Sequence, residues 1–219
     1  MRSRLFPSLL PALAALLLPG GFLSNPARGA SPLDLSKLPA PPGSRPVAVF
    51  PQTAIHVTDA GVAETVEACA QLFQKQGWVP YGGTGDTRHY KRGTDLLIVM
   101  VQSAPGQGGK TTASYNADVL AADIPAPPDA EEIQFANTTK RLTFFSKRSP
   151  DDVASQYGAV LAPDGWTTRM AKPEKSDFRF EIIYRHPEKG MLLVEMTPTE
   201  GRTLTTVTHS TAGEVAAER

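Results

Sequence analysis

Hydrophobic and polar residues alternate along several stretches in the second half of the chain, with the period of two that is typical of half-buried β-strands. The stretches are residues 133–135, 142–144, 178–184, 192–196 and 203–208. The last of them is rich in Thr and Val, which favour strands. We predict that the final strands form an antiparallel meander.

A helix is predicted between the second and third of these stretches. Ser149-Pro150-Asp151-Asp152 combines an N-cap serine, a proline at the first helical position and two acids in the first turn. The apolar residues that follow at helical spacing are Val153, Tyr157, Val160 and Leu161. Pro163-Asp164-Gly165 is expected to end the helix, and Trp166 to open the next strand.

The first half of the chain has a similar pattern. Residues 47–57 are predicted to be extended, with a break at Pro51. Thr58 or Asp59 is predicted to cap a helix. The predicted buried face of that helix is Val62, Val66, Cys69 and Phe73. A hairpin is expected to join residues 88–91 to residues 96–101.

Three sequence landmarks occur twice in the same order, which indicates a duplicated module. They are Leu38–Gly43 with Ile124–Asp129, Gly77-Trp78 with Gly165-Trp166, and Gly109–Thr111 with Gly201–Thr203, at offsets of 86, 88 and 92. The predicted fold class is α+β, with two tandem β-α-β-β-β modules, antiparallel sheets with one packed helix each, and a pseudo-twofold arrangement. Pairing edge to edge into one sheet and pairing back to back both remain open.

The N-terminal segment resembles a secretory signal peptide. Two arginines precede an uncharged apolar stretch, and Ala27-Arg28-Gly29 fits a processing site. A retained membrane anchor is the alternative, but Pro7, Pro11 and Pro19 in the apolar stretch disfavour a spanning helix. The predicted organisation is a signal peptide at 1–30, modules at 31–123 and 124–212, and a polar tail at 213–219. Residues 31–46 are expected to form an extended arm, and residues 120–132 a proline-stiffened connector.

Composition narrows the function. The chain has 22 Lys and Arg and 22 Asp and Glu, and removal of residues 1–30 would leave a net charge of −3. We therefore expect no nucleic-acid binding and, after processing, no stable membrane insertion. The single cysteine cannot form an internal disulfide or a multi-cysteine zinc site.

Two glycine-rich segments invite nucleotide-binding interpretations. Ala104–Thr111 approximates a phosphate loop, but no helical pattern follows it, and its repeat counterpart at 199–203 is predicted to be a hairpin turn. Gly82–Asp86 is not followed by a helix either, as a dinucleotide fingerprint would require. We predict a turn and a loop, and no cofactor.

The reactive residue types are dispersed. The histidines at 56, 89, 186 and 209 have no second ligand at i+3 or i+4, and no HExxH or G-x-S-x-G pattern occurs. Cys69 is expected in the core, and the acid pairs at 131–132 and 151–152 in the connector and at the helix start. No catalytic, cofactor-binding or metal-binding residues are therefore predicted.

Other polar and aromatic features have structural explanations. The basic clusters at 88–92, 140–141 and 147–148 flank predicted strands and suit a solvated sheet face. Trp78 and Trp166 are interpreted as hydrophobic anchors. Asn137-Thr138-Thr139 is an N-glycosylation sequon, relevant only in a cell that performs that modification.

The pattern PxPPxA…F…SPxxVxxxYxxxLxxxGW at residues 125–166 resembles an exported tandem-repeat module of uncharacterised bacterial proteins. The resemblance implies no catalytic residues. We expect a periplasmic or secreted, non-catalytic binding or assembly module of the cell envelope, which contacts another envelope or extracellular protein through its inter-module surface or free sheet face. The alternative is a secreted hydrolase whose site is built from dispersed residues.

Overall fold

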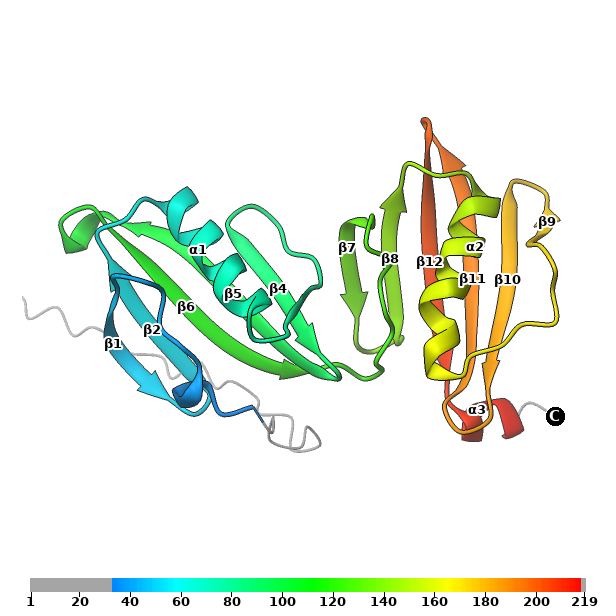
Figure 1. Cartoon of the computed structure of the whole chain (residues 1–219), viewed down its shortest axis with the longest axis horizontal. Coiled ribbons are helices and arrows are strands. Elements are labelled where there is room, and N and C mark those ends of the chain that lie inside the picture. The colour runs from blue at the N-terminus through cyan, green and yellow to red at the C-terminus, as the bar shows by residue number, and fades with distance from the viewer. Residues whose placement is uncertain (1–32, 218–219) are drawn as a thin grey trace, which may run out of the picture. The chain divides into compact units, whose positions relative to one another are not determined.

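The computed structural model of the chain describes residues 33–217, so the predicted signal peptide lies outside the described residues. Within the described range, the strands form two separate six-stranded antiparallel sheets rather than one continuous sheet (Figure 1). None of the described helices is both long and apolar enough to cross a membrane.

The first module contains one sheet and one α-helix. Its strands are β1 (Arg45–Phe50), β2 (Thr53–Thr58), β3 (Val79–Pro80), β4 (Thr87–Arg92), β5 (Asp95–Ala104) and β6 (Lys110–Val119), in the spatial order β1-β2-β6-β5-β4-β3. The helix α1 (Val62–Gln74) covers one face of the sheet (Figure 1). Two short 3-10 helices, η1 (Leu35–Lys37) and η2 (Pro105–Gln107), precede β1 and β6.

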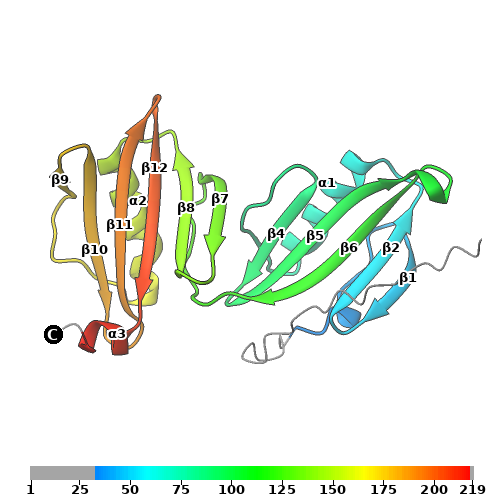
Figure 2. The same ribbon diagram turned by 180° about the vertical axis from the view of Figure 1, so that it is seen from behind.

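The second module repeats this arrangement. Its strands are β7 (Glu131–Ala136), β8 (Arg141–Ser146), β9 (Glu174–Ser176), β10 (Arg179–His186), β11 (Gly190–Thr199) and β12 (Arg202–Ser210), in the order β7-β8-β12-β11-β10-β9. Its helices are α2 (Pro150–Leu161), η3 (Ala162–Asp164) and α3 (Ala212–Ala217). From behind, strands rather than a long helix face the viewer in each module (Figure 2).

The identical strand orders confirm two tandem α+β modules with antiparallel sheets. The predicted β-α-β-β-β unit is too short, however. Each helix is preceded by a hairpin, β1-β2 or β7-β8, and followed by four strands, of which the last three form the expected meander. The break in the first hairpin falls at Pro51-Gln52, between β1 and β2.

The helix starts differ between the modules. Ser149 caps α2 as predicted, because its hydroxyl oxygen accepts a hydrogen bond from the Asp152 N–H at 3.3 Å. The N-cap of α1 is Gly61, not Thr58 or Asp59. The Thr58 hydroxyl instead accepts from the Ala60 N–H at 3.2 Å, which closes a tight turn before the helix. The prediction for the first helix start was therefore wrong by two or three residues.

Each module has a core between its helix and its sheet. In the first, Cys69 and Phe73 of α1 pack on sheet residues that include Leu97 and Tyr115. In the second, the buried cluster contains Tyr81 and Leu96 of the first module and Leu120, Ala122 and Ile124 of the connector, together with the following residues of the module: Leu142, Phe144, Val153, Ala154, Tyr157, Leu161, Trp166, Ile182, Tyr184, Leu192, Val194, Met196 and Val207. The connector is thus part of a core rather than a free spacer.

Two side chains of the first module hold the connector. The Tyr81 hydroxyl donates to the Ile124 carbonyl at 2.9 Å, and the Lys91 ammonium donates to the same carbonyl at 2.8 Å. Lys91 also pairs with Asp123 at 2.5 Å. Burial lowers the pKa of Lys91, while Asp123 opposes that shift.

Two described segments outside the sheets, residues 33–44 and 212–217, are more ordered than predicted. The arm before β1 contains η1, and Leu33 and Leu35 are buried. The residues assigned to a polar tail form most of α3, which begins at Ala212. Its start is a capping box, since the Thr211 N–H donates to the Glu214 carboxylate and the Glu214 N–H donates to the Thr211 hydroxyl.

The two tryptophans are buried anchors, with 2% and 6% of Trp78 and Trp166 exposed. The Arg92 guanidinium lies 4.5 Å from the Trp78 ring centroid, and the His186 ring lies 5.4 Å from that of Trp166. Trp166 does not open a strand, since the next residue forms only an isolated bridge.

Candidate functional site

The two glycine-rich segments that resemble nucleotide-binding motifs form a turn and a loop. Ala104–Thr111 crosses from β5 to β6 through η2, and residues 199–202 join β11 to β12 as a turn, as the repeat predicted. Gly82–Asp86 lies in the loop before β4. Gly83 is required there because its φ is +123° and a Cβ would lie 2.2 Å from the Thr87 carbonyl oxygen.

The four histidines lie in four different strands, although the His186 and His209 rings both pack against Trp166. His56 lies in β2, His89 in β4, His186 at the end of β10 and His209 in β12. In residues 33–217, no three His, Cys, Asp or Glu side chains are grouped so that they could hold a metal ion. The His186 Nδ1 accepts hydrogen bonds from two backbone N–H groups of the β10-β11 turn, so this ring shapes the turn.

Cys69 is not placed for nucleophilic chemistry. Only 1% of the residue is exposed, and burial raises the pKa of its thiol to about 11. Its sulfur lies 4.0 Å from the Tyr115 hydroxyl oxygen. Because the thiolate is the reactive form, this thiol is inert at neutral pH.

Most of the basic clusters form ion pairs. Lys140 contacts Glu214 at 2.7 Å. Lys147 contacts Glu131 at 2.7 Å, and Arg148 contacts Asp129 at 2.6 Å. Glu131 is one of the two adjacent acids at 131–132 that were predicted to lie in the connector. These interactions support the interpretation of the clusters at 140–141 and 147–148 as solvated surface, whereas Lys91 of the cluster at 88–92 is buried.

The side-chain amide of Asn137 is occupied. Its Nδ2 donates to the Val119 carbonyl at 3.0 Å, and its Oδ1 accepts from the Ala121 N–H at 2.8 Å. The sequon asparagine lies in the turn between β7 and β8, and it therefore ties this turn to the end of β6 and to the connector.

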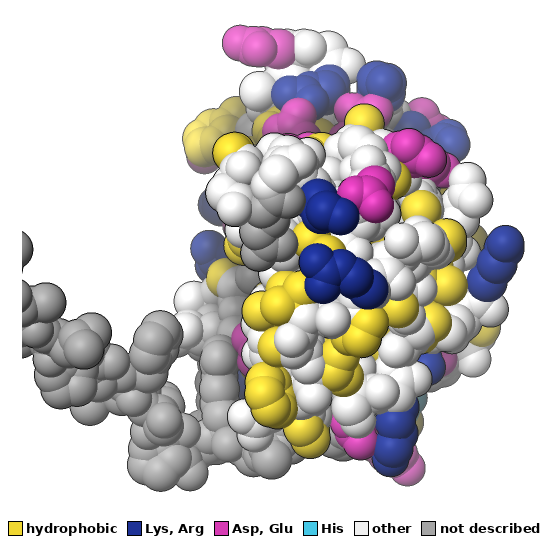
Figure 3. Space-filling view, turned by 90° about the vertical axis from the view of Figure 1, so that its left-hand side faces the viewer, with side chains coloured by type: hydrophobic (Ala, Val, Ile, Leu, Met, Phe, Trp, Pro, Cys, Tyr) yellow, Lys and Arg dark blue, Asp and Glu magenta, His cyan; other side chains and the backbone are white. Residues whose placement is uncertain are grey.

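The edge strand β1 exposes apolar side chains. Val47, Val49 and Phe50 are 51%, 38% and 61% exposed, and Figure 3 shows hydrophobic side chains gathered at this end of the first module beside Lys and Arg. Pro46 and a bulge between Pro46 and Ala48 interrupt the edge. Such interruptions are devices that prevent an edge strand from pairing with another chain.

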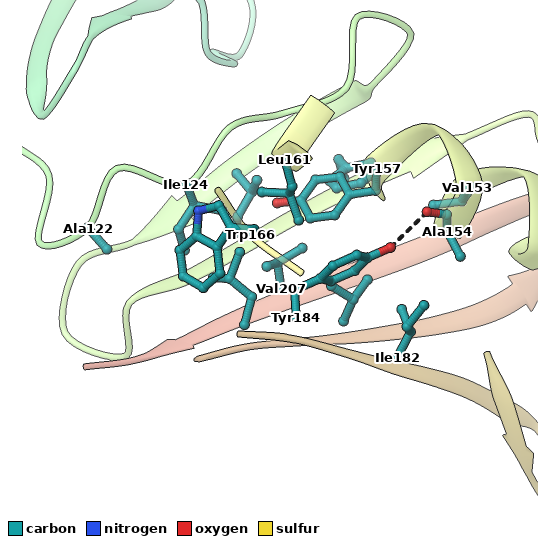
Figure 4. Close-up of a cluster of buried hydrophobic side chains, with 14 of the residues drawn as sticks. Ala122, Ile124, Val153, Ala154, Tyr157, Leu161, Trp166, Ile182, Tyr184 and Val207 are labelled. Atoms are coloured by element: carbon teal, nitrogen blue, oxygen red, sulfur yellow. Dashed lines mark hydrogen bonds between the residues drawn. The ribbon is translucent and has the colours of Figure 1, made fainter. Parts of the chain in front are cut away.

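A pocket of about 370 Å³ opens in the second module between α2, β10 and the loop at 168–173. The residues of the helix and strand that line it are Asp151, Ala154, Ser155, Gly158, Ile182 and Tyr184. Figure 4 shows Ala154, Ile182 and Tyr184 close together, with the Tyr184 hydroxyl directed at the helix. This volume is in the range of about 300–1,000 Å³ found for small-molecule sites.

Small side chains on α2 make room for this pocket. The fifth residue after the N-cap is Val66 in α1 and Ala154 in α2. The ninth is Ala70 in α1 and Gly158 in α2. Glycine inside a helix costs about 1 kcal/mol relative to alanine, so Gly158 needs a reason.

Part of that reason is the contact with Tyr184. A Cβ on Gly158 would lie 3.3 Å from the Tyr184 hydroxyl oxygen, which is tighter than an ordinary contact. The hydroxyl donates to the Ala154 carbonyl at 2.8 Å. Tyr184 is neutral at physiological pH, and burial raises its pKa further, to about 12; its ring forms an apolar floor with Ile182.

A longer loop forms the outer wall of the pocket. In the first module, Val79 follows Trp78 and pairs with Lys91, which follows Tyr90. In the second module, Thr167 follows Trp166 and bridges to Arg185, which follows Tyr184. The tryptophan and tyrosine are 12 positions apart in the first module and 18 in the second. The second module therefore has six extra residues at this place.

The insertion also changes the sheet edge. In the first module, the His89 N–H donates to the Gly82 carbonyl at 2.9 Å. The matching residue of β10 is Ile183, whose N–H donates to the Met170 sulfur at 3.4 Å. A backbone acceptor has been replaced by a thioether, which is a weak acceptor.

The sequence analysis predicted a contact surface at the free sheet face or between the modules. It did not predict this pocket. The available signals were the unequal spacing of tryptophan and tyrosine and the glycine inside α2. No protein-family model and no curated protein matches the chain.

Proposed function

We propose that this chain is an exported, non-catalytic binding module of the cell envelope, and that the pocket beside α2 in its second module is the binding site. The observation that carries the proposal is the divergence between the copies. Small residues on α2 and a six-residue insertion open a pocket at a position where the first module has larger side chains and a short connection.

The chemistry of the pocket favours binding over hydrolysis. Its floor is apolar, and the Tyr184 hydroxyl is already engaged, since it donates to the Ala154 carbonyl at 2.8 Å. A hydrolase needs an activated nucleophile or a positioned acid and base. The thiol of Cys69 belongs to the core of the other module. The secreted hydrolase therefore stays a prediction without a supporting observation, and so does a partner protein of the envelope.

The test is to identify what the chain carries when it is purified from its own cells. Ser155 is exposed and lines the pocket, so Ser155→Trp should fill it without disturbing the core. Ala159→Trp is the matched control, because Ala159 is also exposed on α2 but does not line the pocket. Native mass spectrometry should find a small molecule on the wild type and on Ala159→Trp, and none on Ser155→Trp. The same spectrum for all three proteins would refute the proposal.

A further inference from the structure

Met170 separates two hollows at the edge of the second sheet. It lines the pocket beside α2 and also a second hollow of about 390 Å³, whose other lining residues are Thr167, Arg169, Ile183 and Arg185. The Met170 side chain is half-buried against the core. An occupant that displaced this side chain would reach both hollows.

The second hollow favours an anion. Arg169 and Arg185 are exposed, and neither forms an ion pair with another residue in 33–217. The Ile183 N–H, which now donates to a thioether, would form a stronger hydrogen bond to a charged oxygen. Lys172 adds a further positive charge to the lining of the first pocket, and Asp151 contributes a negative charge there.

Together these features define an amphiphilic ligand. We propose that the site takes a small carboxylate with an apolar body, of the acyl carboxylate class. The carboxylate accepts the Ile183 N–H in place of the Met170 sulfur and pairs with Arg169 and Arg185. The apolar body lies on the floor formed by Ile182 and Tyr184. This inference rests on the proposed function, because it names the ligand class of the same pocket.

The test uses the processed chain and two probes of opposite charge, octanoate and octyltrimethylammonium. With ¹³C-methyl methionine and ¹⁵N labelling, octanoate should shift the Met170 methyl and the Ile183 amide resonances. Arg169→Gln with Arg185→Gln should weaken octanoate binding about tenfold, the sum of two exposed ion pairs of about 0.7 kcal/mol each. Arg141→Gln is the matched control, since Arg141 is exposed on β8 and lies outside both hollows.

The outcomes separate the two proposals. The ligand class is wrong if both probes bind equally, or if the double arginine variant binds octanoate as the wild type does. In either case the pocket remains the binding site, provided that Ser155→Trp abolishes the binding. If neither probe binds, the ligand class is also wrong. The proposed function then stands only if a retained molecule is found on the wild type and is absent from Ser155→Trp.

Discussion

In each module a tyrosine donates to the carbonyl of the equivalent proline, but the tyrosine comes from the sheet in the first module and from the helix in the second. In the second module, Tyr157 of α2 donates to the Pro125 carbonyl at 2.9 Å. In the first, Tyr115 of β6 donates to the Pro39 carbonyl at 3.4 Å. Pro39 and Pro125 occupy the same place in the repeated Pro-Ala-Pro-Pro segment.

The exchange of positions is reciprocal. Cys69 and Tyr157 both lie eight residues after their N-caps, so a cysteine stands in α1 where α2 has a tyrosine. Tyr115 pairs with Ala54, whereas its counterpart Val207 pairs with Leu142. The duplicated fold has therefore kept one ring and one satisfied carbonyl per module, but not the position that supplies them. Both carbonyls are partly buried, and such groups need a donor, whichever element provides it.

The comparison predicts a difference in alkaline stability between the two modules. All five tyrosines of the chain are buried and have raised pKa values; burial is the first cause in each case. The unfolded chain releases these protons near pH 10 while the folded chain holds them. The stabilisation is therefore complete below about pH 10 and is lost as the pH rises above it, by about 1.4 kcal/mol per pH unit for each group.

The first module should begin to lose stability at a lower pH, because its core holds Cys69 with Tyr90 and Tyr115, whereas the core of the second module holds Tyr157, Tyr184 and also the ring of Tyr81. Each module has one tryptophan, so Trp166→Phe leaves a fluorescence reporter of the first module and Trp78→Phe one of the second. Urea unfolding of each variant between pH 9 and 11 should show that the loss of stability begins at a lower pH in the first module. Tyrosinate absorbance at 295 nm that appears before unfolding would contradict the prediction.

Moving the tyrosine of the first module from β6 to α1 tests whether the two core arrangements are interchangeable. Tyr115→Val should cost the first module about 3 kcal/mol through the cavity and the lost hydrogen bond. Cys69→Tyr should cost about 1–3 kcal/mol, because Tyr115 already fills the space next to the sulfur. The double variant reproduces the second module's arrangement, and its cost should be at least about 1 kcal/mol smaller than the sum.

Urea unfolding of the first module, followed by Trp78 fluorescence, measures these costs. The control is Cys69→Tyr with Tyr184→Phe, two residues in different cores that should behave additively. If Cys69→Tyr and Tyr115→Val are also additive, the two tyrosines are not alternative solutions to one packing problem.

Local signals explain what the sequence could predict. Alternation, the Ser149 cap and the repeated landmarks depend on neighbouring residues, and the strands, α2 and the duplication were found from them. The start of α1 was missed because Thr58 and Asp59 are better caps than Gly61, yet Thr58 is used in a turn. The helix α3 had a signal that was overlooked, since Thr211-Ala-Gly-Glu214 matches a capping box.

The pocket could not be predicted in this way. It forms where a loop, a helix and a strand meet, and residues 154, 170 and 182 become neighbours only through the fold. The drifting offset of the repeat, from 88 to 92, showed a net gain of four residues after the tryptophan, but neither the six-residue insertion nor its place on the sheet edge. A duplicated sequence shows where the copies differ, and the fold then shows what the difference builds.

The smallest expected effect concerns the helix caps. Gly61 has φ −65° and ψ 163°, an ordinary N-cap conformation, and a Cβ there would meet nothing within 4 Å. Gly61→Ser should therefore stabilise the first module by a few tenths of a kcal/mol, and Ser149→Ala should destabilise the second by about 1 kcal/mol. Gly61→Ala separates the two sources of the gain. If Gly61→Ala stabilises as much as Gly61→Ser in urea unfolding, the gain comes from the reduced entropy of the unfolded chain; if it does not, the serine hydroxyl caps α1 as it does α2.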